Sequence, residues 1–179
     1  MVTKENFYII TGGPGGGKTT LLENLSSKGY SFVPETARQI IKNRLSRGLT
    51  PRPEPLIFAT GIFEKDLANF MLNTHCSSTL FFDRSLLDSA CQIFNCDKNY
   101  YDKIKAVTET HRYNNKVFIT PPWEEIYQTD TERDQTFKQA VEVYEMLYQW
   151  YVQHNYEVLV LPNDSVENRA AFVLNNLND

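Results

Sequence analysis

The chain is poor in the features that mark secreted, membrane-bound or disulfide-stabilised proteins. Its three cysteines contain no C-x-x-C pair, so neither a disulfide framework nor a cysteine zinc site is expected. No apolar run approaches the roughly 18 residues of a membrane span, and the first residues carry no leader-like apolar stretch. We therefore expect a protein of a reducing compartment, most simply the cytoplasm, with no membrane partner.

Positive charge is also scarce. The formal net charge is −4, and the 18 lysines and arginines form no long cluster. Nucleic acids and anionic membrane surfaces both require a basic footprint on the protein, so neither is expected as the main partner. The 179 residues, of which 41% are hydrophobic, suffice for a single globular domain that spans 1–179.

Glycine, by contrast, is concentrated in one short loop. The apolar run 7–10 stops at Thr11, and five glycines and one proline then fill 12–17. Lys18 and Thr19 follow and open a helical pattern, which completes the motif G-x-x-x-x-G-K-[ST]. Because glycine has no Cβ, successive backbone N–H groups can approach a phosphate chain, and the helix that follows adds its positive dipole end.

This motif predicts a nucleoside triphosphate site. Lys18 supplies an ammonium for the β and γ phosphates, and the hydroxyl of Thr19 is a ligand for Mg²⁺. The alternative is a Gly-rich turn that binds nothing, but the strand before it and the helix after it argue against that alternative. The expected nucleotide contacts are Gly13, Pro14, Gly15, Gly16, Gly17, Lys18, Thr19 and Thr20.

Short apolar runs alternate with helical patterns along the whole chain. Strands are expected at 7–10, 30–33, 79–82, 116–119 and 158–161. Helices are expected after the loop and at 35–45, 56–76, 86–94, 100–110, 137–154 and from a capping box at Asp164-x-x-Glu167. This alternation predicts an α/β fold with a parallel sheet covered on both faces, whose ligand lies at the carboxyl ends of the strands.

Charged residues lie just past two of these strands. Asp83 ends the third run, where an acid would hold Mg²⁺ beside Thr19; as an alternative, Asp83 could cap the next helix. Arg84 could reach the substrate or a transferred phosphate, or be a surface or structural residue. Glu35 lies just past the second strand and could orient or deprotonate an acceptor hydroxyl, or could equally be a first-turn helix residue favoured by the helix dipole. Arg38 falls on the same helix face as Glu35 and could bind an acidic substrate group.

The acidic stretch between the fourth strand and the long helix at 137–154 is a candidate lid, at about 122–135. Within it, Arg133 is the candidate for stabilising the charge that develops during phosphoryl transfer. As an alternative, the segment is a solvated helix start rich in acidic residues. The loop at 162–165 could border the base of the nucleotide. The isolated histidines are interpreted as structural or surface residues, namely His75, His111 and His154.

Four stretches together resemble a known family. They are GGPGGGKTTLLENLSSKGYSFVPETARQII, FFDRSLLD, PPWEEIYQTDTERDQTFKQAVEVYEMLYQWY and LPNDSVENRA, which span 7–174. They look like the small AAA-type predicted ATPases with a P-loop, a group related to the ribosylnicotinamide kinase domain of the bacterial NAD-biosynthesis regulator. The Asp-Arg-Ser element is also similar to one in nucleoside kinases.

The resemblance implies a P-loop kinase-like fold of three αβα layers, with the five parallel strands in the order 2-3-1-4-5. By position it carries into the site Lys18, Thr19, Glu35, Arg38, Asp83, Arg84, Asp130 and Arg133. Arg133 is the only arginine among five acids of the lid segment, which argues against a phosphorylated acceptor. No N-K-x-D pattern follows a strand, so a Ras-like GTPase is not expected.

Three functions follow from these residues. The leading hypothesis is an Mg²⁺-dependent phosphotransferase that moves phosphate from ATP, or GTP, to a small hydroxyl-bearing metabolite such as a nucleoside. The second is a nucleotide-binding regulatory switch with a protein partner, and the third is a nucleoside-triphosphate hydrolase. The identity of the acceptor, the choice between ATP and GTP and the oligomeric state stay open at this point.

Overall fold

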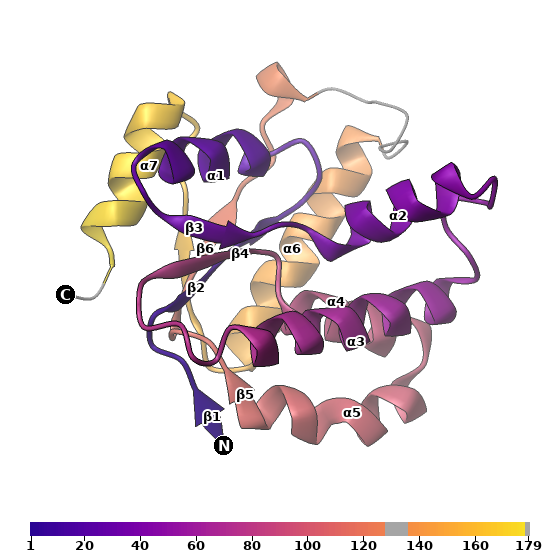
Figure 1. The fold of residues 1–179 in the computed structure, drawn as a ribbon. Coiled ribbons are helices and arrows are strands. Elements are labelled where there is room, and N and C mark those ends of the chain that lie inside the picture. Colours follow the sequence, from indigo (N-terminus) through magenta and orange to yellow (C-terminus); the bar gives the residue numbers. More distant parts are fainter. Residues whose placement is uncertain (128–135, 178–179) are drawn as a thin grey trace.

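A five-stranded parallel sheet forms the centre of the computed structural model, which describes residues 1–127 and 136–177 (Figure 1). Its strands lie in the order β3 (Ser31–Val33), β4 (Leu80–Asp83), β2 (Phe7–Gly12), β6 (Lys116–Thr120) and β7 (Glu157–Val160). Every neighbouring pair is parallel. Numbered along the chain, this is the predicted order 2-3-1-4-5, so the predicted fold is confirmed.

The alternation of side chains along β2 divides the core into two layers. Phe7 and Ile9 face a cluster formed with α3 (Pro55–Leu72), α4 (Leu86–Cys96) and α6 (Phe137–Gln153). Tyr8 and Ile10 face the opposite way, toward α1 (Lys18–Ser27) and α7 (Val166–Asn175). Strand side chains alternate between faces, so a six-residue strand buried on both faces must sit at the sheet's centre. Figure 1 shows the resulting three layers.

The remaining elements lie around this core. α2 (Thr36–Ser46) follows β3, and α5 (Lys98–Thr110) packs beside α4. A small parallel pair that the sequence did not predict joins β1 (Val2–Thr3) to β5 (His111–Arg112). η1 (Glu124–Ile126) is a single turn after β6. No helix in the described part of the chain is long and apolar enough to cross a bilayer.

Several helix ends differ from the prediction. α7 is capped by Ser165, whose Oγ accepts a hydrogen bond from the Asn168 N–H, so the predicted cap at Asp164 is wrong by one residue. Asp164 instead accepts from the Ser165 N–H at 2.6 Å. α4 is capped by Ser85, which leaves Asp83 free of the capping role considered for it. α3 ends at Leu72, four residues before the expected end.

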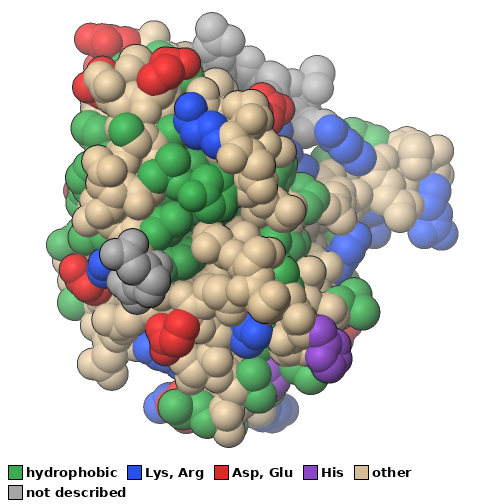
Figure 2. Space-filling model, turned by 60° about the vertical axis from the view of Figure 1, so that its left-hand side comes forward, with side chains coloured by type: hydrophobic (Ala, Val, Ile, Leu, Met, Phe, Trp, Pro, Cys, Tyr) green, Lys and Arg blue, Asp and Glu red, His purple; other side chains and the backbone are tan. Residues whose placement is uncertain are grey.

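The edge strand β7 leaves part of the sheet at the surface. Figure 2 brings forward the side of the molecule that carries α1 and α7, and it shows hydrophobic side chains grouped in the middle of that face. Val160 of β7 is 42% exposed. At the opposite end of the order, β3 is short and only partly buried, as is usual for an edge strand.

Asp66 is a buried carboxyl group where α3 packs against α4. The Ser89 hydroxyl donates to its Oδ2 at 2.9 Å. Burial raises the pKa of Asp66 to about 7, because desolvation outweighs the hydrogen bonds from Thr36 and Ser89. The negative charges of Asp88 and Glu35 act in the same direction as burial. The folded protein therefore favours the protonated form of Asp66 over a pH range in which the unfolded chain is ionised.

This shift predicts a pH-dependent stability. Because the folded pKa lies above the unfolded value, the contribution of Asp66 is fully present below pH 4 and is lost as the pH rises through 7. The variant Asp66→Asn lacks this titration. Its free energy of unfolding, measured by urea denaturation, should increase relative to that of wild type as the pH is raised from 5 to 8.

The control is Asp102→Asn, at an exposed position on α5. It should differ from wild type by no more than ~0.5 kcal/mol at either pH. A difference between Asp66→Asn and wild type that is the same at pH 5 and pH 8 would contradict a raised pKa at this position.

Candidate active site

The glycine-rich loop joins the end of β2 to the start of α1, at the carboxyl edge of the sheet. Its glycines are needed for close packing as well as for ligand access. A Cβ at Gly12 would lie 2.3 Å from Thr120 Oγ1, and the φ of Gly12 is +132°. A Cβ at Gly16 would lie 2.6 Å from the same oxygen. The loop is therefore pressed against the end of β6, which fixes its shape before any ligand arrives.

Lys18 folds back over this loop. Its Nζ donates to the carbonyl oxygens of Gly12 at 3.2 Å and Gly13 at 2.8 Å. Burial lowers the pKa of Lys18 to about 8, and the positive charge of Arg84 adds to this effect. The ammonium is thus largely charged at neutral pH and is held by weak carbonyl acceptors. A phosphate oxygen is a stronger partner for it, so Lys18 is placed to exchange one for the other.

Two cavities meet at Lys18. The first, which we call the loop cavity, has a volume of about 560 Å³ and is lined by Gly15, Gly16, Gly17, Lys18, Thr19, Thr20, Trp123, Glu125, Ile126, Asp164, Ser165, Val166 and Arg169. The second, the arginine cavity, has a volume of about 310 Å³ and is lined by Pro14, Lys18, Glu35, Ala37, Arg38, Ile41, Arg52, Phe58, Arg84, Gln92, Val143, Met146 and Leu147. Both sizes suit small-molecule ligands.

Asp83 provides the expected acidic group beside the loop. It is the last residue of β4, and its Oδ1 is buried with no hydrogen-bond partner among the described residues. Burial raises its pKa to about 6, and nearby Glu35 adds to this effect, whereas Lys18 and Arg84 oppose it. A cation would relieve an orphaned carboxylate oxygen in this position.

The residues present fit a magnesium ion. Mg²⁺ prefers oxygen ligands and is usually held by one or two protein oxygens together with substrate phosphates and water. Thr19, in the first turn of α1, offers a hydroxyl in the loop cavity, and Asp83 offers its free oxygen. No group of three or more acids, histidines or cysteines forms a separate metal site in the part of the chain that the structure describes.

Glu35 and two arginines form an ion cluster on the wall of the arginine cavity. The Nε of Arg84 donates to Glu35 Oε1 at 2.9 Å, and the Nε of Arg38 lies 3.2 Å from Oε2. Glu35 is the residue before α2, but its side chain makes no capping bond. Burial opposes its ionisation, yet Arg84 and Lys18 outweigh burial and hold the pKa of Glu35 below its usual range. Glu35 is therefore a charged carboxylate aimed at the site.

Arg84 is held in an unusual backbone conformation. Its φ is +68°, in the left-handed region that costs a non-glycine residue about 1–2 kcal/mol. Its N–H donates to the Ile10 carbonyl at 3.0 Å, and its Nη1 lies 3.6 Å from Asp88 Oδ1. Only 17% of its side chain is exposed, so Arg84 is not a surface arginine. The structural role and the contact with substrate both stay predictions.

Asp88 connects this arginine to three elements of the core. Its carboxylate accepts hydrogen bonds from the hydroxyl groups of Thr11 in β2 and Tyr151 in α6. The Ser85 N–H donates to it at 2.9 Å, which completes the capping box of α4. A buried carboxylate that accepts several hydrogen bonds is held in one orientation. Asp88 therefore fixes the place of Arg84 opposite Glu35.

Arg169 is a site residue that sequence reasoning did not single out. It reaches from α7 to the loop, where its Nη2 donates to the Gly16 carbonyl at 2.9 Å. The side chain is buried, and its Nε has no partner within the described ranges 1–127 and 136–177. The guanidinium also lies 5.7 Å from the ring centroid of Trp123. Arg169 therefore forms one wall of the loop cavity and places a positive charge beside the glycine loop.

The remaining predicted residues have different outcomes. Asp130 and Arg133 fall outside the described residues, so their predicted roles stay predictions. The expected base-bordering loop at 162–165 does contribute Asp164 and Ser165 to the loop cavity. His154 donates from Nδ1 to the Trp150 carbonyl at 2.7 Å and shares a hydrogen bond between Nε2 and the Tyr101 hydroxyl at 3.0 Å, consistent with a structural histidine.

The position of Arg169 predicts a loss of nucleotide affinity in Arg169→Gln. The variant lacks the bond to Gly16 and the positive charge beside the loop, and charge-assisted bonds contribute ~1.5–3 kcal/mol. The dissociation constant for an Mg²⁺–ATP analogue, measured by calorimetry, should rise about tenfold or more. The same substitution at the exposed Arg47 is the control, and equal affinities in the two variants would contradict this role.

Comparisons with known proteins agree with this geometry. Deoxyadenosine kinase from M. mycoides, with dCMP and a flexible dCDP bound, aligns at 16% identity with a TM-score of 0.72, covering 96% of this chain and 98% of that chain. The NadR protein in complex with NR aligns at 14% identity with a TM-score of 0.72, covering 97% of this chain and 50% of that one. Thymidylate kinase from Ehrlichia chaffeensis aligns at 17% identity with a TM-score of 0.61, covering 96% and 97%.

At these identities the three structures establish a common fold, that of P-loop kinases. No curated protein matches the sequence itself. A family model described as an AAA domain matches residues 7–169, from the first core strand to the buried arginine of α7. This match includes the glycine loop, the ion cluster and both cavities, and the chain therefore belongs to the AAA domain family of P-loop proteins.

Proposed function

We propose that the protein is an Mg²⁺-dependent kinase that transfers the γ-phosphoryl group of ATP to a hydroxyl group of a small metabolite, such as a nucleoside. The observation that carries this proposal is the place of Lys18. It lines the loop cavity and the arginine cavity at once, so one ammonium lies between a site for a polyphosphate and a site for a second molecule. A hydrolase needs only the first of these sites.

The loop cavity suits the nucleotide. Backbone N–H groups of the loop and the start of α1 favour a polyphosphate, and Lys18 would pair with its β and γ phosphates. Thr19 and Asp83 would hold Mg²⁺, which neutralises charge on the phosphates when it is bound. Trp123 lines this cavity and offers an aromatic ring for the base. These walls suit adenine and guanine alike, and ATP is proposed as the commoner donor.

The ion cluster suits the acceptor. A hydroxyl group that binds beside Glu35 can give its proton to the ionised carboxylate as its oxygen bonds to the γ-phosphorus. The bond from that phosphorus to the bridging oxygen breaks, and the nucleoside diphosphate leaves. Arg84 lies 2.9 Å from Glu35 and can stabilise the charge that develops on the phosphoryl oxygens. Arg133 and Asp130 are proposed to complete the site from the candidate lid.

The similar structures support the choice of a kinase. Two of them are named as deoxyadenosine and thymidylate kinases, and another deoxyadenosine kinase structure contains bound dATP. The arginine cavity, at about 310 Å³, suits a metabolite and is too small for a nucleic acid duplex. ATP and magnesium are abundant in the cytoplasm, which we propose as the protein's compartment.

Glu35→Gln tests this function. The amide keeps the shape of the side chain but cannot take a proton, so turnover with an accepted substrate should fall ~10²–10⁴-fold. Affinity for the Mg²⁺–ATP analogue should change less than threefold, because Glu35 lies in the other cavity. Transfer is measured as ADP formed in the presence and absence of an acceptor panel of nucleosides and sugars.

The control is Glu23→Gln, at an exposed position on α1, which should keep wild-type turnover. Wild-type turnover in Glu35→Gln would remove this residue from the mechanism. ADP formation that no acceptor accelerates would instead favour a hydrolase. No ADP formation, together with tight nucleotide binding, would favour a regulatory switch.

A further inference from the structure

Arginines are concentrated on the acceptor side of the site. Among its described lining residues, the arginine cavity has three arginines, Arg38, Arg52 and Arg84, and one acid, Glu35. They come from α2, from the loop before α3 and from the end of β4, so the fold brings them together from separate segments. Lys18 adds a further positive charge at the border with the loop cavity.

The arginines differ in which carboxylates neutralise their charge. Arg84 lies between Glu35 and Asp88, so two carboxylates compensate it. Arg38 forms an ion pair with Glu35 through its Nε alone. Its Nη2 is buried and has no hydrogen-bond partner in the described part of the chain. A buried donor without an acceptor costs about 1–3 kcal/mol, more when it is charged, so the site lacks an acceptor at this point.

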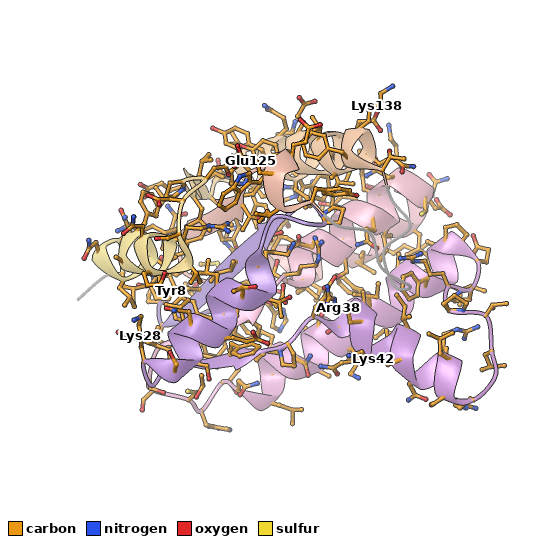
Figure 3. The ribbon with its side chains drawn as sticks, turned by 90° about the horizontal axis from the view of Figure 1, so that it is seen from above. Tyr8, Lys28, Arg38, Lys42, Glu125 and Lys138 are labelled. Carbon is orange, nitrogen blue, oxygen red and sulfur yellow. The ribbon has the colours of Figure 1, made fainter. Side chains whose placement is uncertain are left out.

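The direction of Arg38 fits a ligand contact. Arg38 lies on α2 one turn after Glu35 and extends toward the middle of the carboxyl edge in Figure 3. Lys42, one further turn along α2, is exposed and does not line the cavity. A guanidinium presents parallel N–H groups that match the two oxygens of a carboxylate or a phosphate.

The other walls describe the body of the ligand. Apolar side chains from α2, α3 and α6 line the cavity, namely Ile41, Phe58, Val143, Met146 and Leu147. Gln92 of α4 adds one amide, which can both donate and accept a hydrogen bond. Such walls favour a flat ring that has a few polar atoms at its edge.

We infer that the acceptor is a hydroxyl-bearing ring compound that also carries a carboxylate or phosphate group, bound by Arg38 with Arg52 beside it. This inference rests on the proposed kinase function and adds the charge class of its substrate. It reverses the expectation drawn from the single arginine of the lid segment, because Arg52 reaches the cavity from a different loop.

Matched pairs of ligands test the inference. The carboxylate pair is uridine and orotidine, which is uridine with a 6-carboxylate, and the phosphate pair is adenosine and adenosine 3′-monophosphate. Their dissociation constants are measured by calorimetry on the full chain with Mg²⁺ and a non-hydrolysable ATP analogue. In at least one pair, the charged member should bind wild type tenfold tighter or more, which corresponds to about 1.4 kcal/mol.

Three variants assign that preference to its residues. Arg38→Gln should remove the preference while it changes affinity for the neutral member less than threefold. Arg52→Gln, at an exposed position where folding is not at risk, should reduce the preference. Lys42→Gln removes the same charge from the same helix outside the cavity and should leave both members unchanged.

The outcomes separate this inference from the kinase proposal. Equal or tighter binding of both neutral members overturns the inference, as does a failure of both charged members to bind. An Arg38→Gln variant that loses affinity only for the ATP analogue assigns Arg38 to the nucleotide and also overturns it. Phosphorylation of neutral nucleosides alone would keep the kinase function and reject the charged acceptor. Arg38-dependent binding of a charged member without phosphorylation would support the inference and count against the kinase.

Discussion

The ion pair between Glu35 and Arg84 is the contact on which the site depends. It joins the end of β3 to the end of β4, two neighbouring strands whose carboxyl ends open toward the same edge. Neither charge could be buried alone, since an unpaired ion loses its hydration without replacement. Asp88 and its hydroxyl donors extend the pair into the core, so the site and the fold share one polar network.

Lys18 connects this network to the nucleotide site. Its ammonium is influenced by charges from both sides, with Arg84 lowering its pKa and Asp83, Glu35 and Asp88 raising it. The carboxylates therefore keep a buried lysine ionised, and the lysine in turn favours the ionised form of Glu35. Lys18, Glu35, Arg84 and Asp83 therefore form a coupled set, in which each charge shifts the pKa of its neighbours.

Much of this arrangement could be predicted from the sequence, because the signals are local. Residues 12–19 carry a spaced motif, and Glu35, Asp83 and Arg84 lie just past apolar runs, where a parallel sheet places its ligands. Arg169, Arg52 and Gln92 have no such signal. Arg169 meets Gly16 across 153 residues of sequence, and only the packing of α7 against α1 brings them together. The cap of α7 was misplaced because Asp164 and Ser165 are both good capping residues, and backbone geometry decides between them.

The left-handed backbone conformation of Arg84 is a cost to folding that its side-chain contacts require. Glycine or asparagine would occupy this φ more comfortably, and either would relieve local strain in the connection between β4 and α4. Neither could reach Glu35 and Asp88 with a guanidinium. A sequence selected for stability alone would therefore tend to replace this arginine. Under the proposed mechanism, a relative with a small residue here would fold well and lack activity.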